Sequence, residues 1–211
     1  MILSTHLIDF YVNLMYNSRK NIGKSMTRNE LVKMLDFLDE KGVWCFNINI
    51  FNLFFPNEAK SVRNVSLKRH ADNRTILNVC RGFYANPRAR SRPSFALPRL
   101  AYLIRPREVF YISYETALSD YGIISQMPNR LTFATTGRSQ IYDTPYGILE
   151  FTHSTKNPAV FLEDCTFYDD YGLYYANPRK AVKDAVRANR NVGLIDFDEL
   201  DRMEKNNELA G

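Results

Sequence analysis

The sequence predicts an α+β protein built from two domains, and three observations lead to that class. Helix signals followed by a hairpin signal fill the first 85 residues, a stretch rich in proline and arginine comes next, and short strand patterns alternate with helix patterns after residue 100. Of the 211 residues, 45% are hydrophobic and 13% aromatic, which is enough to bury a sizeable core. We therefore expect a folded chain and not a disordered one.

Composition also argues against a membrane protein. Charged residues make up 24% of the chain, and its longest apolar run, residues 43–55, is interrupted by asparagines. That run is shorter than the roughly 20 residues that cross a bilayer. The N-terminus has no early lysine or arginine, which a secretory signal would carry. We expect a soluble, cytoplasmic protein with no membrane partner.

Two helices are expected before residue 42. Leucines and aromatic residues recur at helical spacing over residues 3–14 and predict an extra N-terminal helix. Thr27 and Glu30 match a capping box and Gly42 supplies a stop, so a second helix is predicted over about 28–41. Its apolar residues, which we expect to face a core, are Leu31, Met34, Leu35 and Leu38.

A short helix, a longer helix and a hairpin complete the predicted first domain. The apolar stretch 49–55, closed by Pro56, is expected to form the short helix. The longer helix, the third when the extra N-terminal helix is left out, is expected over about 59–71. Residues 76–80 and 83–85 read as two strands joined by a turn at Arg81 and Gly82. Helix, short helix, helix and hairpin is the order of a winged helix-turn-helix, so we assign residues 1–85 to such a domain, with the extra helix at its start.

The positive charge is concentrated in the middle of the chain. Residues 60–107 contain twelve lysines and arginines but only one acid, Asp72, whereas residues 1–59 are neutral and residues 108–211 carry a net charge of −6. Ten of the twelve cations are arginine, whose forked guanidinium suits phosphates and guanine edges. This segment predicts a polyanion-binding surface. The alternative is a solvated arginine-rich linker.

On the third helix, positions four residues apart stack on one side. We expect Lys60, Asn64 and Lys68 to form an exposed row that contacts base edges or phosphates. Arg69 is expected to run along the core edge. The residues expected on the buried side are Ala59, Val62, Val65 and Ser66. The alternative is an ordinary surface helix with a solvated basic face.

Further cations flank this helix. Arg74 and Arg81 lie where the hairpin of a winged helix would touch a DNA backbone, and residues 86–99 read as a proline- and arginine-rich linker whose arginines can reach a minor groove or phosphates. The full set of predicted DNA-binding residues is Lys60, Ser61, Arg63, Asn64, Lys68, Arg74, Arg81, Arg88, Arg90 and Arg92.

Residues 100–211 are predicted to form a mixed α/β domain. Helices are expected near 96–104, over 114–121, from Asn177 to about 188, and around Phe197 to Met203. Strands are expected over 109–112, 131–135 and 140–151, the last broken at residues 143–147, which together predict a small antiparallel sheet.

Signals for an enzyme are weak. Asp196 and Asp198 resemble the metal-binding carboxylate pair of a nucleotidyltransferase, but the Gly-Ser loop of that fold is missing, so we expect the pair to cap the final helix. The three cysteines and three histidines are scattered, which argues against a disulfide framework or a zinc site. Phosphate-binding glycine loops and nucleophile elbows are absent. We expect no catalytic residues, no metal and no cofactor.

Several short segments of the sequence resemble motifs of a known protein family, and they occur in the same order as in that family. Residues 111–124 (YISYETALSDYGII) resemble the "Y-(I/L)-S-x-E-(S/T)-A-L-x-x-(Y/H)-G-L-I" segment of AbiEi-type antitoxins. Residues 132–138 and 142–147 are similar to its "T-x-A-T-x-x-R … F-x-T-P-F-G" hairpin, and residues 175–184 to its "A-x-P-E-(R/K)-A-L-x-D" helix start, with Arg179 in place of the usual acid. Residues 81–84 match the "R-G-(V/L)-Y" that closes its wing. The resemblance covers about 27–205.

This resemblance implies a transcriptional regulator of a type IV toxin-antitoxin (abortive infection) system. Its first domain would bind double-stranded DNA at inverted repeats upstream of its own operon, as an autorepressor. Its second domain would counteract a nucleotidyltransferase toxin without a stable complex. The extra N-terminal helix and the arginine-dense linker depart from the family.

Two other functions stay open at this point. A nucleic-acid-processing enzyme, either nucleotidyltransferase-like or a nuclease toxin, could use the basic segment to hold RNA. A winged-helix repressor unrelated to any toxin could sense a small ligand through its second domain.

Overall fold

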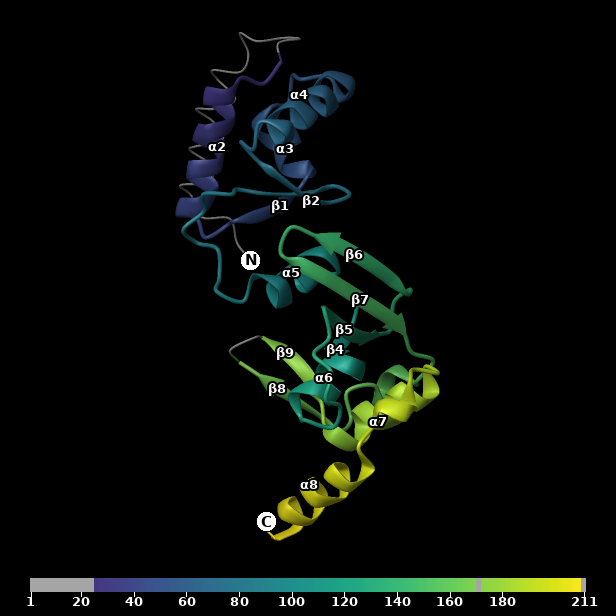
Figure 1. The fold of residues 1–211 in the computed structure, drawn as a ribbon. Helices are drawn as coiled ribbons and strands as arrows, with labels where there is room; N and C mark the ends of the chain where they lie inside the picture. The colour runs from purple at the N-terminus through teal and green to yellow at the C-terminus, as the bar shows by residue number, and fades with distance from the viewer. Residues whose placement is uncertain (1–24, 170–171, 210–211) are drawn as a thin grey trace. The chain divides into compact units, whose positions relative to one another are not determined.

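The protein divides into two compact units, with the boundary between Ser94 and Phe95. The structure is a computed structural model that describes residues 25–169 and 172–209 (Figure 1). Within those ranges it contains seven α-helices and two sheets of three and six strands, which confirms the predicted α+β class. The helix predicted over residues 3–14 lies outside the described residues. None of the helices in the described part has the length and apolar content needed to cross a membrane.

The first unit contains three helices and a three-stranded antiparallel sheet with the strand order β1-β3-β2. In chain order the elements are α2 (Arg28–Glu40), β1 (Cys45–Asn47), α3 (Asn49–Phe54), α4 (Lys60–Asp72), β2 (Leu77–Cys80) and β3 (Phe83–Ala85). The three helices and the hairpin lie where the sequence predicts them. Strand β1 was not predicted, because its three residues merge with the apolar run around them.

The start of α2 confirms the predicted capping box. The hydroxyl of Thr27 accepts from the backbone N–H of Glu30 at 3.3 Å, and the carboxylate of Glu30 accepts from the backbone N–H of Thr27 at 2.9 Å. Both bonds satisfy donors that a helix start leaves unpaired. The predicted apolar face is also confirmed, because Leu31, Met34, Leu35 and Leu38 are all buried in the core of this unit.

The buried face of α4 differs from the prediction. The structure buries Arg63, Ser66, Leu67 and His70, whereas Val65, expected inside, is 70% exposed. Val62 is only half-buried. The reason is that this face is held mainly by polar contacts, so the positions of the valines do not reveal it. Of the four residues expected on the buried side, only Ser66 is buried there.

The second unit is built on one six-stranded mixed sheet, with the order β6-β7-β5-β4-β9-β8. Its strands are β4 (Phe110–Ile112), β5 (Arg130–Thr135), β6 (Gln140–Thr144), β7 (Gly147–His153), β8 (Cys165–Tyr168) and β9 (Leu173–Ala176). The prediction of a small antiparallel sheet was wrong, because the sheet has six strands and contains both parallel and antiparallel pairs. The pairs β4/β9 and β5/β7 are parallel, and the β8/β9 hairpin was missed.

The helices of the second unit are α5 (Ala96–Ile104), α6 (Tyr114–Asp120), α7 (Pro178–Arg187) and α8 (Phe197–Leu209), and all four were predicted. Two of them begin with the expected caps. The side chain of Asn177 accepts from the backbone N–H of Lys180 at 2.8 Å, and that of Asp196 accepts from the backbone N–H of Glu199 at 3.0 Å. The prediction that Asp196 caps the last helix is therefore confirmed.

The centre of the sheet is packed by aromatic rings. Phe133 and Phe151 stack with their centroids 4.7 Å apart, and Phe110 contacts both rings edge-on at 5.4 Å. Such edge-to-face and stacked pairs favour one fixed packing of neighbouring strands. These three rings therefore hold β4, β5 and β7 against one another at the centre of the sheet.

Candidate nucleic-acid interface

The predicted polar row on α4 is exposed to solvent. Lys60, Asn64 and Lys68 lie on successive turns of the helix, and all three side chains are exposed, as is Ser61 beside them. A helix face with two ammonium groups and one amide can meet phosphates and base edges. That this row contacts nucleic acid stays a prediction.

The opposite face of α4 is fixed by hydrogen bonds to the segment that precedes α2. The buried carboxylate of Glu58 accepts from the backbone N–H of Met26 at 2.8 Å and from the hydroxyl of Ser66 at 3.0 Å. His70 contacts the carbonyl of Met26 at 3.3 Å, and Arg69 donates to the same carbonyl at 3.1 Å. These contacts give the exposed row a rigid support. They also explain why Arg69 does not belong to the row.

Arg63 requires a correction. The sequence places it beside the polar row, but the structure buries it, with 9% of its surface exposed, and its guanidinium donates to the side-chain carbonyl of Asn52 in α3. A buried guanidinium bonded within the fold cannot also reach a phosphate without breaking that contact. Arg63 therefore joins α3 to α4, and we remove it from the candidate interface.

Two further cations lie at the turns on either side of β2. Arg74 is exposed in the turn between α4 and β2, where its φ of 53° lies in the left-handed region. Arg81 is exposed at the tip of the β2/β3 hairpin, beside Gly82. The carbonyl of Gly82 accepts from the backbone N–H of Ile48 at 2.8 Å, which ties the tip of the hairpin to the start of α3. Both arginines are exposed, as the predicted roles require.

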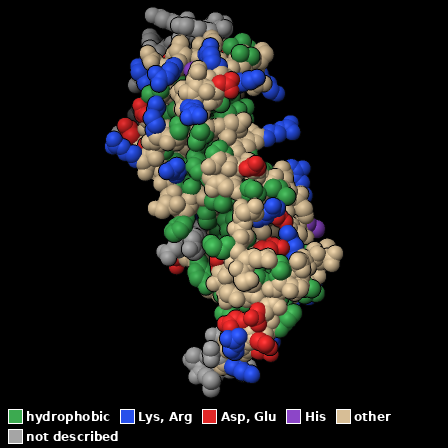
Figure 2. All heavy atoms as spheres, viewed as in Figure 1, with side chains coloured by type: hydrophobic (Ala, Val, Ile, Leu, Met, Phe, Trp, Pro, Cys, Tyr) green, Lys and Arg blue, Asp and Glu red, His purple; other side chains and the backbone are tan. Residues whose placement is uncertain are grey.

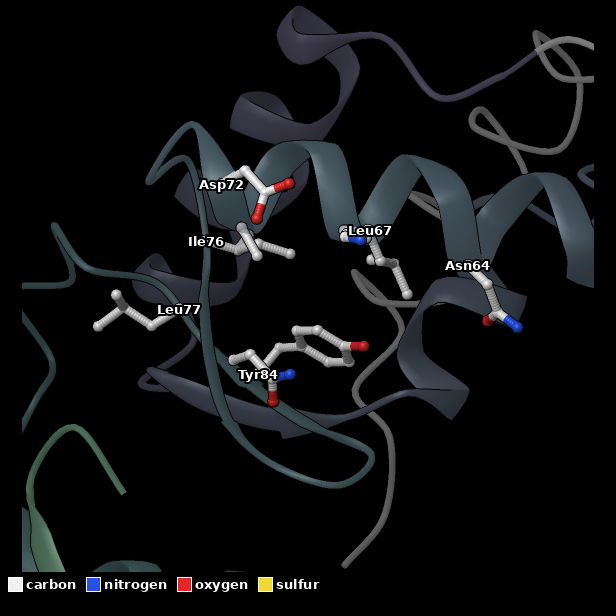
Figure 3. A pocket seen from close by; sticks show the side chains of 9 residues that line it. Asn64, Leu67, Asp72, Ile76, Leu77 and Tyr84 are labelled. Carbon is white, nitrogen blue, oxygen red and sulfur yellow. The ribbon is translucent and has the colours of Figure 1, made fainter. Parts of the chain in front are cut away.

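A hollow of about 420 Å³ separates α4 from the β2/β3 hairpin (Figure 3). Its floor contains Leu67 and Ile76, which are almost completely buried. Its polar lining comes from both elements: Asn64, Lys68 and Asp72 of α4, and Asn78 and Tyr84 of the hairpin. Sequence reasoning missed this hollow. The available signal was the strand alternation that puts Asn78 and Tyr84 on one face of the hairpin.

The ring of Tyr84 forms the hairpin side of the hollow. It contacts the ring of Phe51 edge-on, with the centroids 5.5 Å apart, and this contact fixes its position. In Figure 3 the ring of Tyr84 lies in the space between the hairpin and α4. Partial burial raises the pKa of Tyr84, so its hydroxyl stays protonated at neutral pH and can donate a hydrogen bond.

The arginine-rich segment is tied to the first unit and does not behave as a free linker. The carboxylate of Asp39, in the last turn of α2, accepts from the backbone N–H of Arg90 at 2.9 Å and from that of Ser91 at 2.8 Å. We call this pair of bonds the Asp39 clamp. Hydrogen bonds from Ser91 and Arg90 lower the pKa of Asp39, so it stays charged at neutral pH.

Asn86 fixes the start of the same segment. Its backbone N–H donates to the carbonyl of Trp44 at 2.9 Å, its side-chain amide donates to the carbonyl of Leu35, and its side-chain oxygen accepts from the backbone N–H of Arg88. The side chains of Arg88, Arg90 and Arg92 are nevertheless exposed. The backbone of the segment is therefore fixed, while its arginine side chains face solvent.

The cations of the first unit do not form one continuous row. Lys68 lies beside the hairpin around the hollow, and Arg81 lies at the hairpin tip. The Asp39 clamp holds Arg88, Arg90 and Arg92 beyond the opposite end of strand β3, next to α2. Figure 2 shows lysine and arginine side chains on several parts of this unit. Two basic regions thus result, one on α4 and the hairpin and one at the end of α2.

In the second unit, three donors meet at a buried carboxylate. Asp184 of α7 accepts from the hydroxyl of Tyr111 at 2.8 Å, from that of Ser113 at 3.0 Å and from the ammonium of Lys156 at 2.7 Å. Burial, followed by the charge of Asp184, raises the pKa of Tyr111, so the phenol stays protonated. We call these four residues the Asp184 cluster.

Three of the sequence segments that resemble antitoxin motifs come together at this cluster. Tyr111 and Ser113 belong to the string 111–124, and Asp184 ends the string 175–184. Thr132, from the string 132–138, donates through its hydroxyl to the carbonyl of Ser113 at 2.6 Å. Segments that lie far apart in the sequence are thus joined by side-chain hydrogen bonds in one buried place.

A second charged network crosses the sheet through Glu150 of β7. Its carboxylate accepts from Arg130 at 2.7 Å and from Arg190, which also donates to Thr152 at 2.7 Å. Arg190 lies 3.5 Å from the carboxylate of Glu115. Burial alone would raise the pKa of Glu150, but the hydrogen bonds and charges of the two arginines outweigh it and lower the pKa.

Potential metal ligands do not cluster in the described part of the chain, and the thiols of Cys45 and Cys165 are protonated. Among residues 25–169 and 172–209, no group of three or more histidine, cysteine, aspartate or glutamate side chains could hold a metal ion. Burial raises the pKa of Cys45 to about 12 and that of Cys165 to about 11, so both thiols are protonated at neutral pH and are weak nucleophiles.

No protein-family model matches the sequence, and no curated protein matches it.

We predict that Asp39→Asn loosens the arginine-rich segment. The amide nitrogen of asparagine cannot accept a hydrogen bond, so one of the two backbone bonds of the clamp is lost. Tryptic cleavage after Arg88 and Arg90 should become about fivefold faster, because the segment opens locally more often. Asp36→Asn, an equal charge change at an exposed position of α2, is the control and should cleave at the wild-type rate. Equal rates for Asp39→Asn and wild type would show that the clamp does not hold the segment.

We predict that Glu150 makes the second unit sensitive to acid. Its pKa is lowered by folding, so its ionised form stabilises the fold above the unfolded value of about 4.5, and this stabilisation is lost as the pH falls through the lower folded pKa. Glu150→Gln should reduce the stability near pH 7 and flatten its fall between about pH 5 and pH 3. Urea unfolding followed by amide NMR signals of this unit measures both effects. The exposed Glu163→Gln is the control, and a slope unchanged by Glu150→Gln would contradict the prediction.

Proposed function

We propose that the first unit is a winged helix-turn-helix that binds double-stranded DNA, and that the chain is an AbiEi-type antitoxin and autorepressor. The observation that carries the proposal is the exposed row of Lys60, Asn64 and Lys68 on a rigidly held helix beside a hairpin. In this proposal α4 enters the major groove, and the hairpin and its neighbouring turn contact the backbone.

The order and pairing of the elements support the winged-helix assignment. A helix (α2), a short strand (β1), two helices (α3 and α4) and a hairpin (β2/β3) follow one another, and β1 completes the sheet by pairing with β3. The hydrogen bond between Arg63 and Asn52 joins α3 to α4, the two helices that we assign to the helix-turn-helix. The side of α4 that these contacts leave open carries the polar row.

The distribution of charge supports nucleic acid as the partner. Arg74 and Arg81 lie at the two turns that flank β2, where they can neutralise phosphates next to an inserted α4. The second basic region, held by the Asp39 clamp, contains Arg88, Arg90 and Arg92. In this proposal it contacts a neighbouring stretch of the DNA backbone. The guanidinium groups suit phosphates because they can donate two parallel hydrogen bonds.

The antitoxin part of the proposal rests on the resemblance of the second unit. Three of its strings, 111–124, 132–138 and 175–184, contribute residues in or next to the Asp184 cluster. We infer that the cluster fixes the fold of this unit and does not act as a catalytic centre. A surface of the unit then counteracts a nucleotidyltransferase toxin, without a stable complex between the two proteins.

The DNA-binding proposal predicts a steep dependence on salt. If about six phosphates are engaged, the affinity for the upstream region of its own operon falls about a thousandfold between 50 and 200 mM salt. The triple variant Lys60→Ala, Asn64→Ala, Lys68→Ala should lose the footprint on that region. Fluorescence anisotropy and footprinting with the full chain measure both effects.

A matched triple variant on α2 controls for lost charge. Arg28, Asn29 and Lys33 are exposed and comprise, like the row on α4, two cations and one asparagine. Changing all three to alanine should preserve the footprint. An unchanged footprint for the α4 variant, or equal losses for both variants, would defeat the assignment of α4 as the DNA-reading helix.

The antitoxin proposal predicts a nucleotidyltransferase in the neighbouring reading frame. Co-expression of this chain should relieve the growth arrest that the neighbouring protein causes. The α4 triple variant should lose repression of the operon and still relieve the arrest, because the two activities reside in different units. A neighbouring frame of another class, or arrest that persists with the wild-type chain, would refute this part and leave the DNA-binding part standing.

A further inference from the structure

The hollow between α4 and the β2/β3 hairpin has features of a ligand site that the proposed function does not use. Its volume of about 420 Å³ lies within the range of small-molecule sites in proteins. An apolar floor and a polar edge are also the usual composition of such sites. We propose that this hollow binds a purine base, with adenine as the preferred ring.

The shape and packing of the hollow favour a flat ring. Leu67 and Ile76 lie buried at the base of the hollow. Its accessible apolar surface comes from the half-buried Ala71, Leu77 and Tyr84, and the Tyr84 ring is held edge-on against Phe51 (Figure 3). A planar heteroaromatic ring can contact these side chains with its apolar face. The ring edge then remains directed toward the polar lining.

The polar lining favours a neutral ring with both donors and acceptors. Asn64 and Asn78 line the hollow from its two sides, and each amide offers one acceptor oxygen and two donor hydrogens. This matches the donor and acceptor pair that adenine presents to asparagine through N6 and N7. The hydroxyl of Tyr84 adds a further donor.

The charges in the lining point to a nucleotide and not to a simple anion. Lys68 and Asp72 lie one turn apart on α4 and bring one positive and one negative charge. Lys68 can bind the phosphate of a nucleotide, and Asp72 can accept hydrogen bonds from its ribose hydroxyls. A simple anion would use Lys68 alone, whereas a nucleotide uses both side chains.

The base can come from a free nucleotide or from an unpaired residue of a nucleic-acid strand. In either case the ligand would occupy Asn64 and Lys68, which the proposed duplex interface also uses. Occupation of the hollow would therefore weaken duplex binding. The inference goes beyond the proposed function, because base binding can occur even if the chain does not bind duplex DNA.

The first arm of the test uses adenosine 5′-monophosphate and the full chain. Amide NMR signals of Asn64, Asn78 and Tyr84 should shift saturably, with a Kd below about 1 mM. Asn78→Ala should weaken binding about tenfold and Tyr84→Phe about threefold, the range expected for loss of one hydrogen bond each. Asn73→Ala, an exposed asparagine at the end of α4 that does not line the hollow, is the matched control and should bind as the wild type does.

The second arm distinguishes the source of the base. A single-stranded deoxyadenosine 12-mer replaces the mononucleotide, with the same three variants. Binding of the mononucleotide that is sensitive to Asn78→Ala supports a free nucleotide, whereas binding of the strand alone with the same sensitivity supports an unpaired residue. If neither probe binds, or if Asn78→Ala and Asn73→Ala behave alike with both probes, the inference is overturned.

A third measurement separates this inference from the proposed function. Lys60 belongs to the exposed row but does not line the hollow, and Asn78 lines the hollow but does not belong to the row. Lys60→Ala should weaken duplex binding and leave mononucleotide binding unchanged, whereas Asn78→Ala should do the reverse. Saturating mononucleotide should lower the duplex affinity of the wild type and not that of Asn78→Ala. A duplex affinity of the wild type that saturating mononucleotide leaves unchanged would overturn the proposed competition.

Discussion

The geometry of the first unit depends on the buried carboxylate of Glu58. It joins the segment before α2, through Met26, to the inner face of α4, through Ser66. A buried donor left without a partner costs about 1–3 kcal/mol, so these bonds strongly favour a single orientation of α4. That orientation decides which side chains face solvent. With this orientation the polar row faces solvent and Leu67 enters the apolar core of the unit.

Local sequence patterns predicted the helices of both units, since their caps and apolar spacing involve neighbouring residues. Thr27, Asn177 and Asp196 cap helices as expected, and the apolar face of α2 is buried. The patterns failed on α4, because its inner face is polar and is recognised only through residues such as Met26, about forty positions away. They failed again on the sheet of the second unit, where parallel pairing joins strands distant in the sequence.

The candidate site was predicted in part for the same reason. Exposure of Lys60, Asn64 and Lys68 follows from helical spacing alone, whereas the hollow needs α4 and the hairpin to approach each other. The arginine-rich segment shows the limit of reading composition. Proline and arginine suggested a free linker, but one carboxylate, Asp39, accepts two of its backbone N–H groups and orders it. The arginine-rich segment is ordered by hydrogen bonds between residues far apart in the sequence, and a local sequence pattern does not reveal such bonds.

The position of Trp44 gives the protein a built-in optical reporter. It is the single tryptophan of the chain, it is 5% exposed, and its carbonyl binds the backbone of Asn86 where the arginine-rich segment begins. Indole emission therefore arises from the first unit alone, without any label. A change in its wavelength or intensity would register movement at the start of that segment.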